Sequence, residues 1–174
     1  MIHFIMGITC VGKDELVEHA VKCCPDIGAI QVGKEMRKRH SPEYFKGLGA
    51  LDETEPETWE IVREQLALCS EKKHIFVTGM PRLKGQVSKF FSLFKIEDCR
   101  FWLLHCDEQT IYSRLKIHFK DEPCWANLAE ERIENDKIQL YQVITEVLTC
   151  SKIIALENST FFQRDLNVER ILRG

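Results

Sequence analysis

The sequence predicts an α/β protein in which helices flank a five-stranded parallel sheet. Short apolar runs alternate along the chain with stretches of helical periodicity, as expected when crossover helices join buried parallel strands. A turn containing glycine and lysine joins the first apolar run to the first helical stretch. The 174 residues contain no repeat, linker or low-complexity segment, so we expect a single domain that spans residues 1–174.

Each expected element has a local pattern behind it. Five short apolar runs have the length and composition of buried parallel strands, and they are Ile2–Met6, Ala29–Val32, His74–Thr78, Arg100–Cys106 and Ile153–Leu156. The helical patterns are Lys13–Cys24, Gly33–Arg39, Pro56–Ser70, Lys84–Phe94, Glu108–Phe119, Asn127–Thr149 and Phe162–Leu172. We therefore expect a doubly wound sheet with right-handed crossovers.

Local residues also mark where some elements end. Pro56 suits the first turn of its helix, with Thr54 as a candidate N-cap. Two connections are longer and more polar than the others, His40–Glu55 and Lys120–Ala126. Both are candidates for mobile covers over a bound substrate.

The turn after the first strand is a phosphate-binding loop. It reads Gly7-Ile8-Thr9-Cys10-Val11-Gly12-Lys13, which is G-x-x-x-x-G-K between a buried strand and a helix. The glycines allow the backbone to curl so that its N–H groups point at an anion. The helix that begins near Gly12 directs its positive end to the same place, and Lys13 adds a full charge.

One position departs from the generic loop. A Ser or Thr normally follows the lysine and binds Mg²⁺, whereas Asp14 and Glu15 follow it here. Two carboxylates repel bound phosphates unless a metal or further cations intervene. Asp14 is therefore either a relocated metal ligand or a sign of weakened nucleotide binding.

Composition narrows the class of protein. A net charge of −3 gives no overall basic field for nucleic acid, and the apolar runs are too short to span a membrane. Eight cysteines occur without any C-x2-C pair, so we expect a reduced, cytoplasmic protein without a secretory signal. Cys10 lies inside the phosphate loop, where a small filler is favoured over a reactive thiol.

Two further turns place cations at the carboxyl edge of the expected sheet. Gly79-Met80-Pro81-Arg82 follows one strand, and Gly33-Lys34-Glu35-Met36-Arg37 follows another. Ligands of open α/β sheets bind at this edge. Gln86 comes four residues after Arg82, and its amide can both donate and accept hydrogen bonds toward a base.

The order of these motifs resembles the adenylate kinase-like nucleoside monophosphate kinases. That family combines a P-loop, a Thr-Gly-Asp-x-x-Arg turn and Asp-Gly-Phe-Pro-Arg-x-x-x-Gln with arginines on the helices before and after a lid. The corresponding segments here are Gly7–Lys13, Val32–Arg37, Thr78–Gln86, Asp107-Glu108 with Arg114, and Arg132 within Glu130-Glu131-Arg132-Ile133. The resemblance covers nearly the whole chain and implies a three-layer P-loop kinase fold with an acceptor-binding insert at about 33–70 and a short lid at about 118–127.

The resemblance also implies roles for single residues. ATP would bind to Gly7, Ile8, Thr9, Cys10, Val11, Gly12, Lys13, Asp14, Glu15 and Arg114. The acceptor would bind to Val32, Gly33, Arg37, Gly79, Arg82, Gln86 and Arg132, with Arg37 and Arg82 on its phosphate and Gln86 on its base. Lys13, Arg114 and Arg132 would be catalytic because phosphoryl transfer depends on positioning and on neutralising charge.

Several positions depart from the family pattern. The Asp that precedes Gly-Phe-Pro-Arg is Thr78, the threonine of the Thr-Gly-Asp turn is Val32, and the second pre-lid arginine falls on His118. The lid lacks Arg-x-Asp-Asp, of which Lys120-Asp121-Glu122 is a weak echo, and it has no zinc cysteines. For the metal, we expect an exchange of roles in which Asp14 supplies the charge and Thr78 a hydroxyl; the competing reading is a carboxylate that only caps its helix.

The sequence therefore favours transfer of a phosphoryl group from ATP, with Mg²⁺, to a nucleoside monophosphate. AMP or dAMP is favoured because of Gln86, and the protein is expected to be a monomer. A P-loop kinase for another small phosphorylated metabolite stays open, because a Gly-Lys-Asp loop also occurs in viral deoxynucleoside monophosphate kinases and in one class of phosphomevalonate kinases. A degenerate nucleotide-binding protein with little turnover is the third reading.

Overall fold

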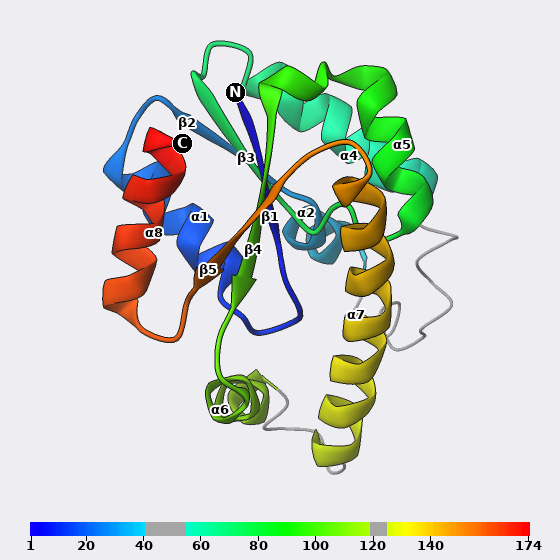
Figure 1. Ribbon diagram of the computed structural model, residues 1–174, viewed down its shortest axis with the longest axis vertical. Coiled ribbons are helices and arrows are strands. Elements are labelled where there is room, and N and C mark those ends of the chain that lie inside the picture. Colours follow the sequence, from blue (N-terminus) through cyan, green and yellow to red (C-terminus); the bar gives the residue numbers. More distant parts are fainter. Residues whose placement is uncertain (41–54, 119–124) are drawn as a thin grey trace.

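The computed structural model describes residues 1–40, 55–118 and 125–174, apart from the side chains of residues 55, 118 and 125–129. Its centre is one parallel sheet with the strand order β2-β3-β1-β4-β5 (Figure 1). The strands are β1 (Ile2–Met6), β2 (Ile27–Gln31), β3 (His74–Thr78), β4 (Cys99–His105) and β5 (Ile153–Glu157). The expected five-stranded parallel sheet is thereby confirmed.

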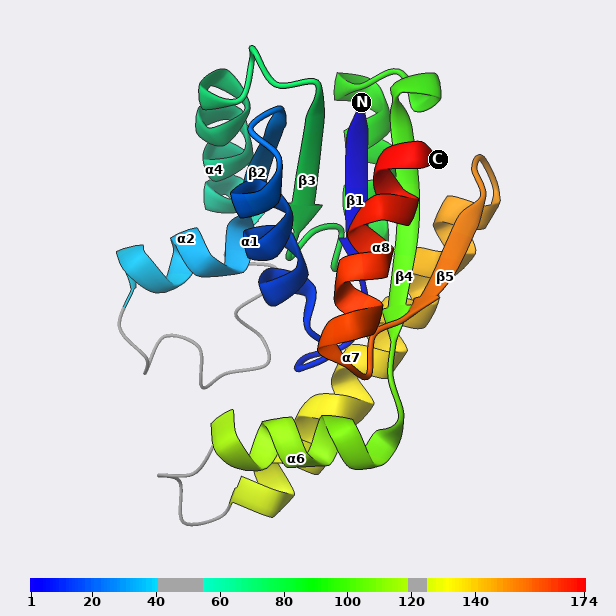
Figure 2. The same cartoon turned by 90° about the vertical axis from the view of Figure 1, so that its left-hand side faces the viewer.

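Helices cover both faces of this sheet. One face carries α1 (Lys13–Cys23) and α8 (Phe161–Arg173), and the other carries α4 (Glu55–Leu68), α5 (Lys84–Leu93) and α7 (Trp125–Leu148) (Figure 1). Helix α2 (Val32–Arg39) and helix α6 (Glu108–His118) lie at the carboxyl end of the sheet, and a 3₁₀ turn, Ile96–Asp98, precedes β4 (Figure 2). Within the described ranges, no helix is long and apolar enough to cross a membrane.

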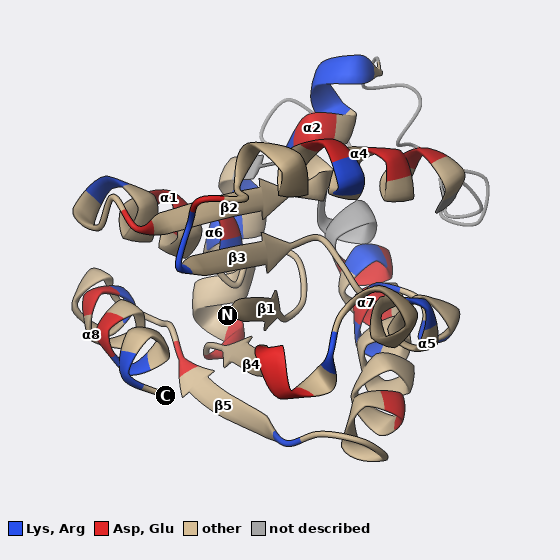
Figure 3. Cartoon of the chain, turned by 90° about the horizontal axis from the view of Figure 1, so that it is seen from above, with Lys and Arg blue, Asp and Glu red and all other residues tan. Residues whose placement is uncertain are grey.

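Charge distribution follows the three layers. Strands β1, β2 and β3 contain no Lys, Arg, Asp or Glu and are tan throughout in Figure 3, whereas blue and red segments mark the outer helices. All five residues of β1 are buried. A central parallel strand is covered on both faces, so it tolerates few charges.

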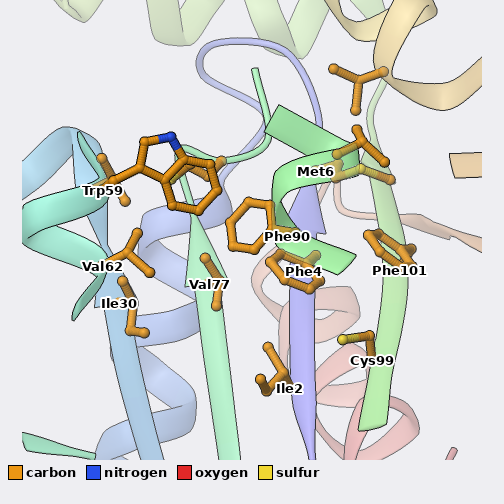
Figure 4. Packing of buried hydrophobic residues seen from close by; sticks show 14 of the residues in the cluster. Ile2, Phe4, Met6, Ile30, Trp59, Val62, Val77, Phe90, Cys99 and Phe101 are labelled. Atoms are coloured by element: carbon orange, nitrogen blue, oxygen red, sulfur yellow. The ribbon is translucent and has the colours of Figure 1, made fainter. Parts of the chain in front are cut away.

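The larger hydrophobic core lies between the sheet and helices α4, α5 and α7. Phe90 of α5 stands between Trp59 and Phe4, with ring centroids 4.9 Å and 4.6 Å away, and Phe101 stacks on Phe4 at 5.0 Å (Figure 4). Each such aromatic pair contributes about 0.5–1.5 kcal/mol beyond its buried area. This core fixes α5, which begins two residues after Arg82, and α7, which carries Arg132.

A second core lies on the opposite face, and a third, smaller one lies beyond the sheet. Leu16 and Val17 of α1 pack with Ile171 of α8 against the sheet. The small core joins Ile111 and Leu115 of α6 to Ile133 of α7, and the phosphate-loop residues Ile8 and Cys10 pack against it. Helices α6 and α7 are therefore held directly against the loop.

The direction in which the chain winds changes between β1 and β3. These strands are neighbours, but the helices that follow them cover opposite faces, α1 after β1 and α5 after β3 (Figure 1). Ligands of open α/β sheets bind at such a switch of direction, outside the carboxyl ends of the strands. The turns that carry Lys13 and Arg82 meet there.

The element boundaries agree with the sequence expectations to within a few residues, with two corrections. Val32 was expected to end the second strand but is the first residue of α2, because pairing between β2 and β3 ends at Gln31 and Thr78. Helix α7 begins at Trp125, so Ala126 is helical and not part of a connection. The expected covers were His40–Glu55 and Lys120–Ala126. Residues 41–54 and 119–124, which hold most of both covers together with Thr54 and the lid echo, lie outside the described residues.

Candidate active site

The phosphate loop takes the backbone conformation that its glycines permit. Gly12 has φ +92°, in the left-handed region, and a Cβ there would lie 2.5 Å from Nδ2 of Asn158. Only glycine satisfies both conditions. Cys10 is also left-handed, at φ 62°, which costs a residue with a Cβ on the order of 1–3 kcal/mol. Helix α1 begins directly after Gly12, so its positive end faces the loop.

Lys13 is folded back onto the loop. Its Nζ donates to the carbonyl oxygens of Gly7, at 2.7 Å, and Ile8, at 2.6 Å. The pKa of Lys13 is lowered to about 8: burial and the positive charge of Arg82 lower it, and Asp136 and Asp14 offset part of this effect. The lysine is thus held beside the loop by two neutral carbonyl oxygens. An anion can replace them, because a charged acceptor forms the stronger hydrogen bond.

Asp14 and Thr78 are in direct contact. The Thr78 hydroxyl, on a side chain that is 1% exposed, donates to Oδ1 of Asp14 at 2.8 Å. Arg37 of α2 donates to the other carboxylate oxygen at 3.5 Å. The two residues for which the sequence predicted exchanged roles therefore share one place between β1 and β3. Glu15 is exposed.

A second ionic cluster joins the loop to α7. Oδ1 of Asp136 pairs with Arg82, at 3.1 Å, and with Arg132, at 3.4 Å. Oδ2 accepts from the backbone N–H of Thr9, at 2.6 Å, and from its hydroxyl, at 2.5 Å. Nε of Arg132 also donates to the Thr9 hydroxyl, at 3.2 Å. Burial opposes the charge on Asp136, but Arg132, Arg82 and Thr9 outweigh it and lower the pKa of this carboxyl group.

The cations of these two clusters influence one another. Burial lowers the pKa of Arg82, and the charges of Arg132 and Arg37 lower it further. Because Arg82 also lowers the pKa of Lys13, the lysine and the three arginines belong to one electrostatic unit. The expected partners Arg37 and Arg82 thus act on each other, although each is bonded to a different carboxylate.

Arg114 lies on another side of the loop. It donates to the carbonyl oxygens of Cys10, at 3.1 Å, Asn158, at 3.3 Å, and Ser159, at 3.4 Å. Asn158 in turn donates to the carbonyl of Val11 at 2.9 Å. Arg114 and the turn after β5 therefore brace the loop from outside, while Arg132 reaches Thr9 from α7.

The remaining residues that were expected to bind the acceptor lie at the start of α2, in the turn after β3 and in the first turn of α5. Val32 is buried, and a Cβ on Gly79, whose φ is +80°, would lie 2.9 Å from the Gly33 nitrogen. Gln86 is 4% exposed, and its Oε1 accepts from the backbone N–H groups of Arg82, at 2.7 Å, and Leu83, at 3.2 Å. The oxygen of Gln86 is therefore used to hold the start of α5, and its reading of a base stays a prediction.

Comparison with solved structures identifies the fold. A shikimate kinase from Bacteroides thetaiotaomicron is similar with a TM-score of 0.61 and 16% identity, covering 99% of this chain and 97% of that one. This chain has the fold of the P-loop kinases. A gluconokinase from Sinorhizobium meliloti 1021 (TM-score 0.56, 13% identity, 98% and 93% covered) and a shikimate kinase from Aquifex aeolicus (0.56, 17%, 99% and 95%) are also similar.

Sequence comparisons add nothing to this likeness. No family model and no curated protein matches the chain. At 13–17% identity, the structural neighbours support the P-loop kinase fold and leave the acceptor open.

Two residues of the candidate site were missed by the sequence reasoning. Asn158 offers no local signal, because its role depends on the turn after β5 reaching Val11. Asp136 does offer one. It shares a helical stripe with Ile133, Leu140, Val143 and Val147, so a carboxylate stands in a row of core-facing positions. A charge on a buried face requires partners, and here they are the two arginines.

The structure favours a filler role for Cys10. Burial raises the pKa of its thiol to about 11, so the reactive thiolate is scarce at neutral pH. Within the described residues, no cluster of three or more His, Cys, Asp or Glu side chains could hold a metal on its own. The oxygens of Asp14 and Thr78 nevertheless fit Mg²⁺ bound with phosphates, because this ion needs few protein ligands besides phosphate and water oxygens.

Proposed function

We propose that this protein transfers the terminal phosphoryl group of ATP to a small anionic acceptor, with a nucleoside monophosphate, AMP or dAMP, as the favoured acceptor. One observation carries the proposal: four cations gather around the phosphate loop and the start of α1. Lys13 and Arg132 donate to loop atoms, Arg82 is joined to the loop through Asp136, and Arg37 pairs with Asp14. Phosphoryl transfer requires several cations around one group and no covalent catalyst.

The residues then have separable tasks. The loop amides and the start of α1 hold the donor phosphates, and Lys13 leaves the Gly7 and Ile8 carbonyls to follow the group in transfer. Arg82 and Arg132 neutralise charge as the group moves, and Arg37 orients the acceptor anion. Asp14 and Thr78 would hold Mg²⁺, which draws charge from the phosphate oxygens.

A second acceptor class is supported by Gln86. Its oxygen already holds the start of α5, which leaves only the amide nitrogen for a base. Another small metabolite, bound through its own anionic group, needs no such reader. The gluconokinase and shikimate kinases with the same fold are named for acceptors of this kind.

A coupled assay of ADP formation tests the proposal. The acceptor panel contains the nucleoside and deoxynucleoside monophosphates, gluconate and shikimate, each with ATP and Mg²⁺. We expect saturable turnover with a monophosphate, above the hydrolysis of ATP alone. No turnover with any acceptor would contradict the proposal and favour a degenerate nucleotide-binding protein.

Lys13→Ala shows whether turnover comes from this site. Losing the charge should lower kcat by at least about 100-fold, the scale of one preorganised donor in a dry site. Lys22→Ala is the matched control, because Lys22 is an exposed lysine on the same helix. Equal activity in Lys13→Ala and the parent would place the reaction elsewhere.

A further inference from the structure

Asp136 occupies the part of the site where the P-loop, the turn after β3 and helix α7 meet. Its side chain belongs to a residue that is only 8% exposed, and both of its oxygens are engaged. One oxygen binds the N–H and hydroxyl of Thr9, and the other binds Arg82 and Arg132. No step proposed above for phosphoryl transfer uses this carboxylate.

The partners of Asp136 are also the groups that a phosphate requires. Backbone N–H groups of a glycine-rich loop bind phosphate oxygens, and guanidinium forks match carboxylates and phosphates alike. Thr9 lies within the loop, and Arg82 and Arg132 are cations of the proposed transfer site. Two anions that share these donors would repel each other across a short distance.

We infer that the Asp136 carboxylate binds Thr9, Arg82 and Arg132 before a phosphate does. It positions these donors, and an incoming phosphate chain displaces it from them. The inference rests on the proposed function only in requiring that the loop binds phosphate. It makes Asp136 a positioning residue whose carboxylate competes with the ligand.

The need for such an anion follows from the charges around it. Lys13, Arg82 and Arg132 lie within one partly buried unit, where like charges repel strongly. Asp136 raises the pKa of Lys13 against the effect of burial, so it helps to keep this lysine charged. Without a counter-charge, the empty cluster would be less stable, and an external anion would be bound more tightly.

The test measures binding of inorganic tripolyphosphate by calorimetry, without nucleotide, acceptor or turnover. Asp136→Asn keeps the shape of the side chain and removes its charge. We expect tripolyphosphate to bind about tenfold more tightly to this variant than to the parent, because juxtaposed like charges cost this much or more. Unchanged or weaker binding, or no binding to either protein, would overturn the inference.

Two control variants locate the effect. Glu134→Gln removes one exposed negative charge from the same helix, so it corrects for net charge and should change the affinity less than twofold. In Lys13→Ala/Asp136→Asn, the gain should be lost if the anion binds in the loop. A gain of the same size in Glu134→Gln, or one that survives loss of Lys13, would also overturn the inference.

Stability supplies the second readout. Asp136→Asn should melt at a lower temperature than the parent without anions, and tripolyphosphate should raise its Tm by more than it raises that of the parent. If the variant folds poorly, tripolyphosphate in the refolding buffer should restore the folded protein. Failure of the anion to rescue it would overturn the inference. A protein that binds tripolyphosphate as described but forms no ADP would instead contradict the proposed function alone.

Discussion

Asp14 and Thr78 pose the sharpest question at the scale of single residues. The carboxylate follows the loop lysine and the hydroxyl ends β3, and the two are hydrogen-bonded at 2.8 Å. A hard cation requires oxygen ligands and some negative charge at the site, but the charge need not come from one sequence position. If Asp14 supplies the charge, exchanging the two residue types should conserve the function.

This reasoning gives a prediction for Mg²⁺ dependence. Asp14→Ser alone should lower kcat and raise the Mg²⁺ concentration needed for half-maximal activity, and adding Thr78→Asp should restore much of the loss. A carboxylate that only caps α1 is worth about 0.3–1 kcal/mol of stability, and its removal would leave activity unchanged or improve it. A Mg²⁺ titration of both variants distinguishes a metal-binding Asp14 from one that only caps the helix. Improved activity in Asp14→Ser would contradict the metal hypothesis.

Arg132 is the residue whose proposed task is confined to transfer. Its Nε donates to the Thr9 hydroxyl from α7, and this is its one hydrogen bond to the loop among the described residues. Arg132→Ala should lower kcat by about 10³-fold, the lower range for an arginine that neutralises a phosphoryl group in flight. Donor affinity should change much less. Arg173→Ala is the control, because the Arg173 side chain is 80% exposed at the end of α8. A large rise in the donor KM with unchanged kcat would contradict this role.

At the scale of elements, the turn between β5 and α8 supports the phosphate loop. Asn158 is 3% exposed and donates to the Val11 carbonyl at 2.9 Å. Asn158→Ala leaves that carbonyl without its donor and should cost about 1–3 kcal/mol of unfolding free energy. Asn135→Ala is the control, because Asn135 is only half-buried and its side chain donates to the Glu131 carbonyl within the same helix. Urea denaturation of both variants checks the difference, and equal losses would show that the turn does not brace the loop.

The elements themselves were predictable because each has its own pattern. β1 and β3 are apolar runs that end at glycine-containing turns, and these runs set both boundaries of each strand. Val32 was misplaced because its apolar side chain is buried whether it ends a strand or begins α2. An apolar pattern indicates that residues are buried, but it does not indicate where a strand ends. The end of β2 depends on how far its hydrogen-bonded partner strand continues.

The site was predictable only where the chain itself carries the signal. Glycines and lysine at fixed spacing located the loop, and the turns after β2 and β3 located Arg37 and Arg82. The contact of Asp136 with Thr9 spans 127 residues of sequence and follows from how α7 packs on the sheet. The same holds for the contact of Asn158 with Val11. Residues that support the loop or neutralise its cations can therefore be recognised only in the folded chain.

At the scale of the whole molecule, a buried group of hydrogen-bonded rings lies in the sheet at the end opposite to the site. His3 of β1 is 1% exposed; its Nδ1 accepts from Nε1 of Trp102 at 3.1 Å, and its Nε2 lies 3.0 Å from Nδ1 of His74. Because Nδ1 is an acceptor, the ring is neutral and Nε2 carries the proton. Burial, together with the neighbouring His74, lowers the pKa of His3 to about 3.

This buried histidine should make stability depend on pH. In the unfolded chain His3 binds a proton near pH 6.5, but in the folded chain it does so only near pH 3, so protons favour unfolding in this interval. The folded state should therefore lose about 2 kcal/mol between pH 7 and pH 5 through His3. Denaturant titrations of the parent, of His3→Gln and of His105→Gln, an exposed histidine, measure this loss. We expect a flatter pH dependence in His3→Gln alone, whatever its absolute stability. If the unfolding free energy depended on pH with the same slope in all three proteins, the His3 ring would be shown to take up its proton in the folded state.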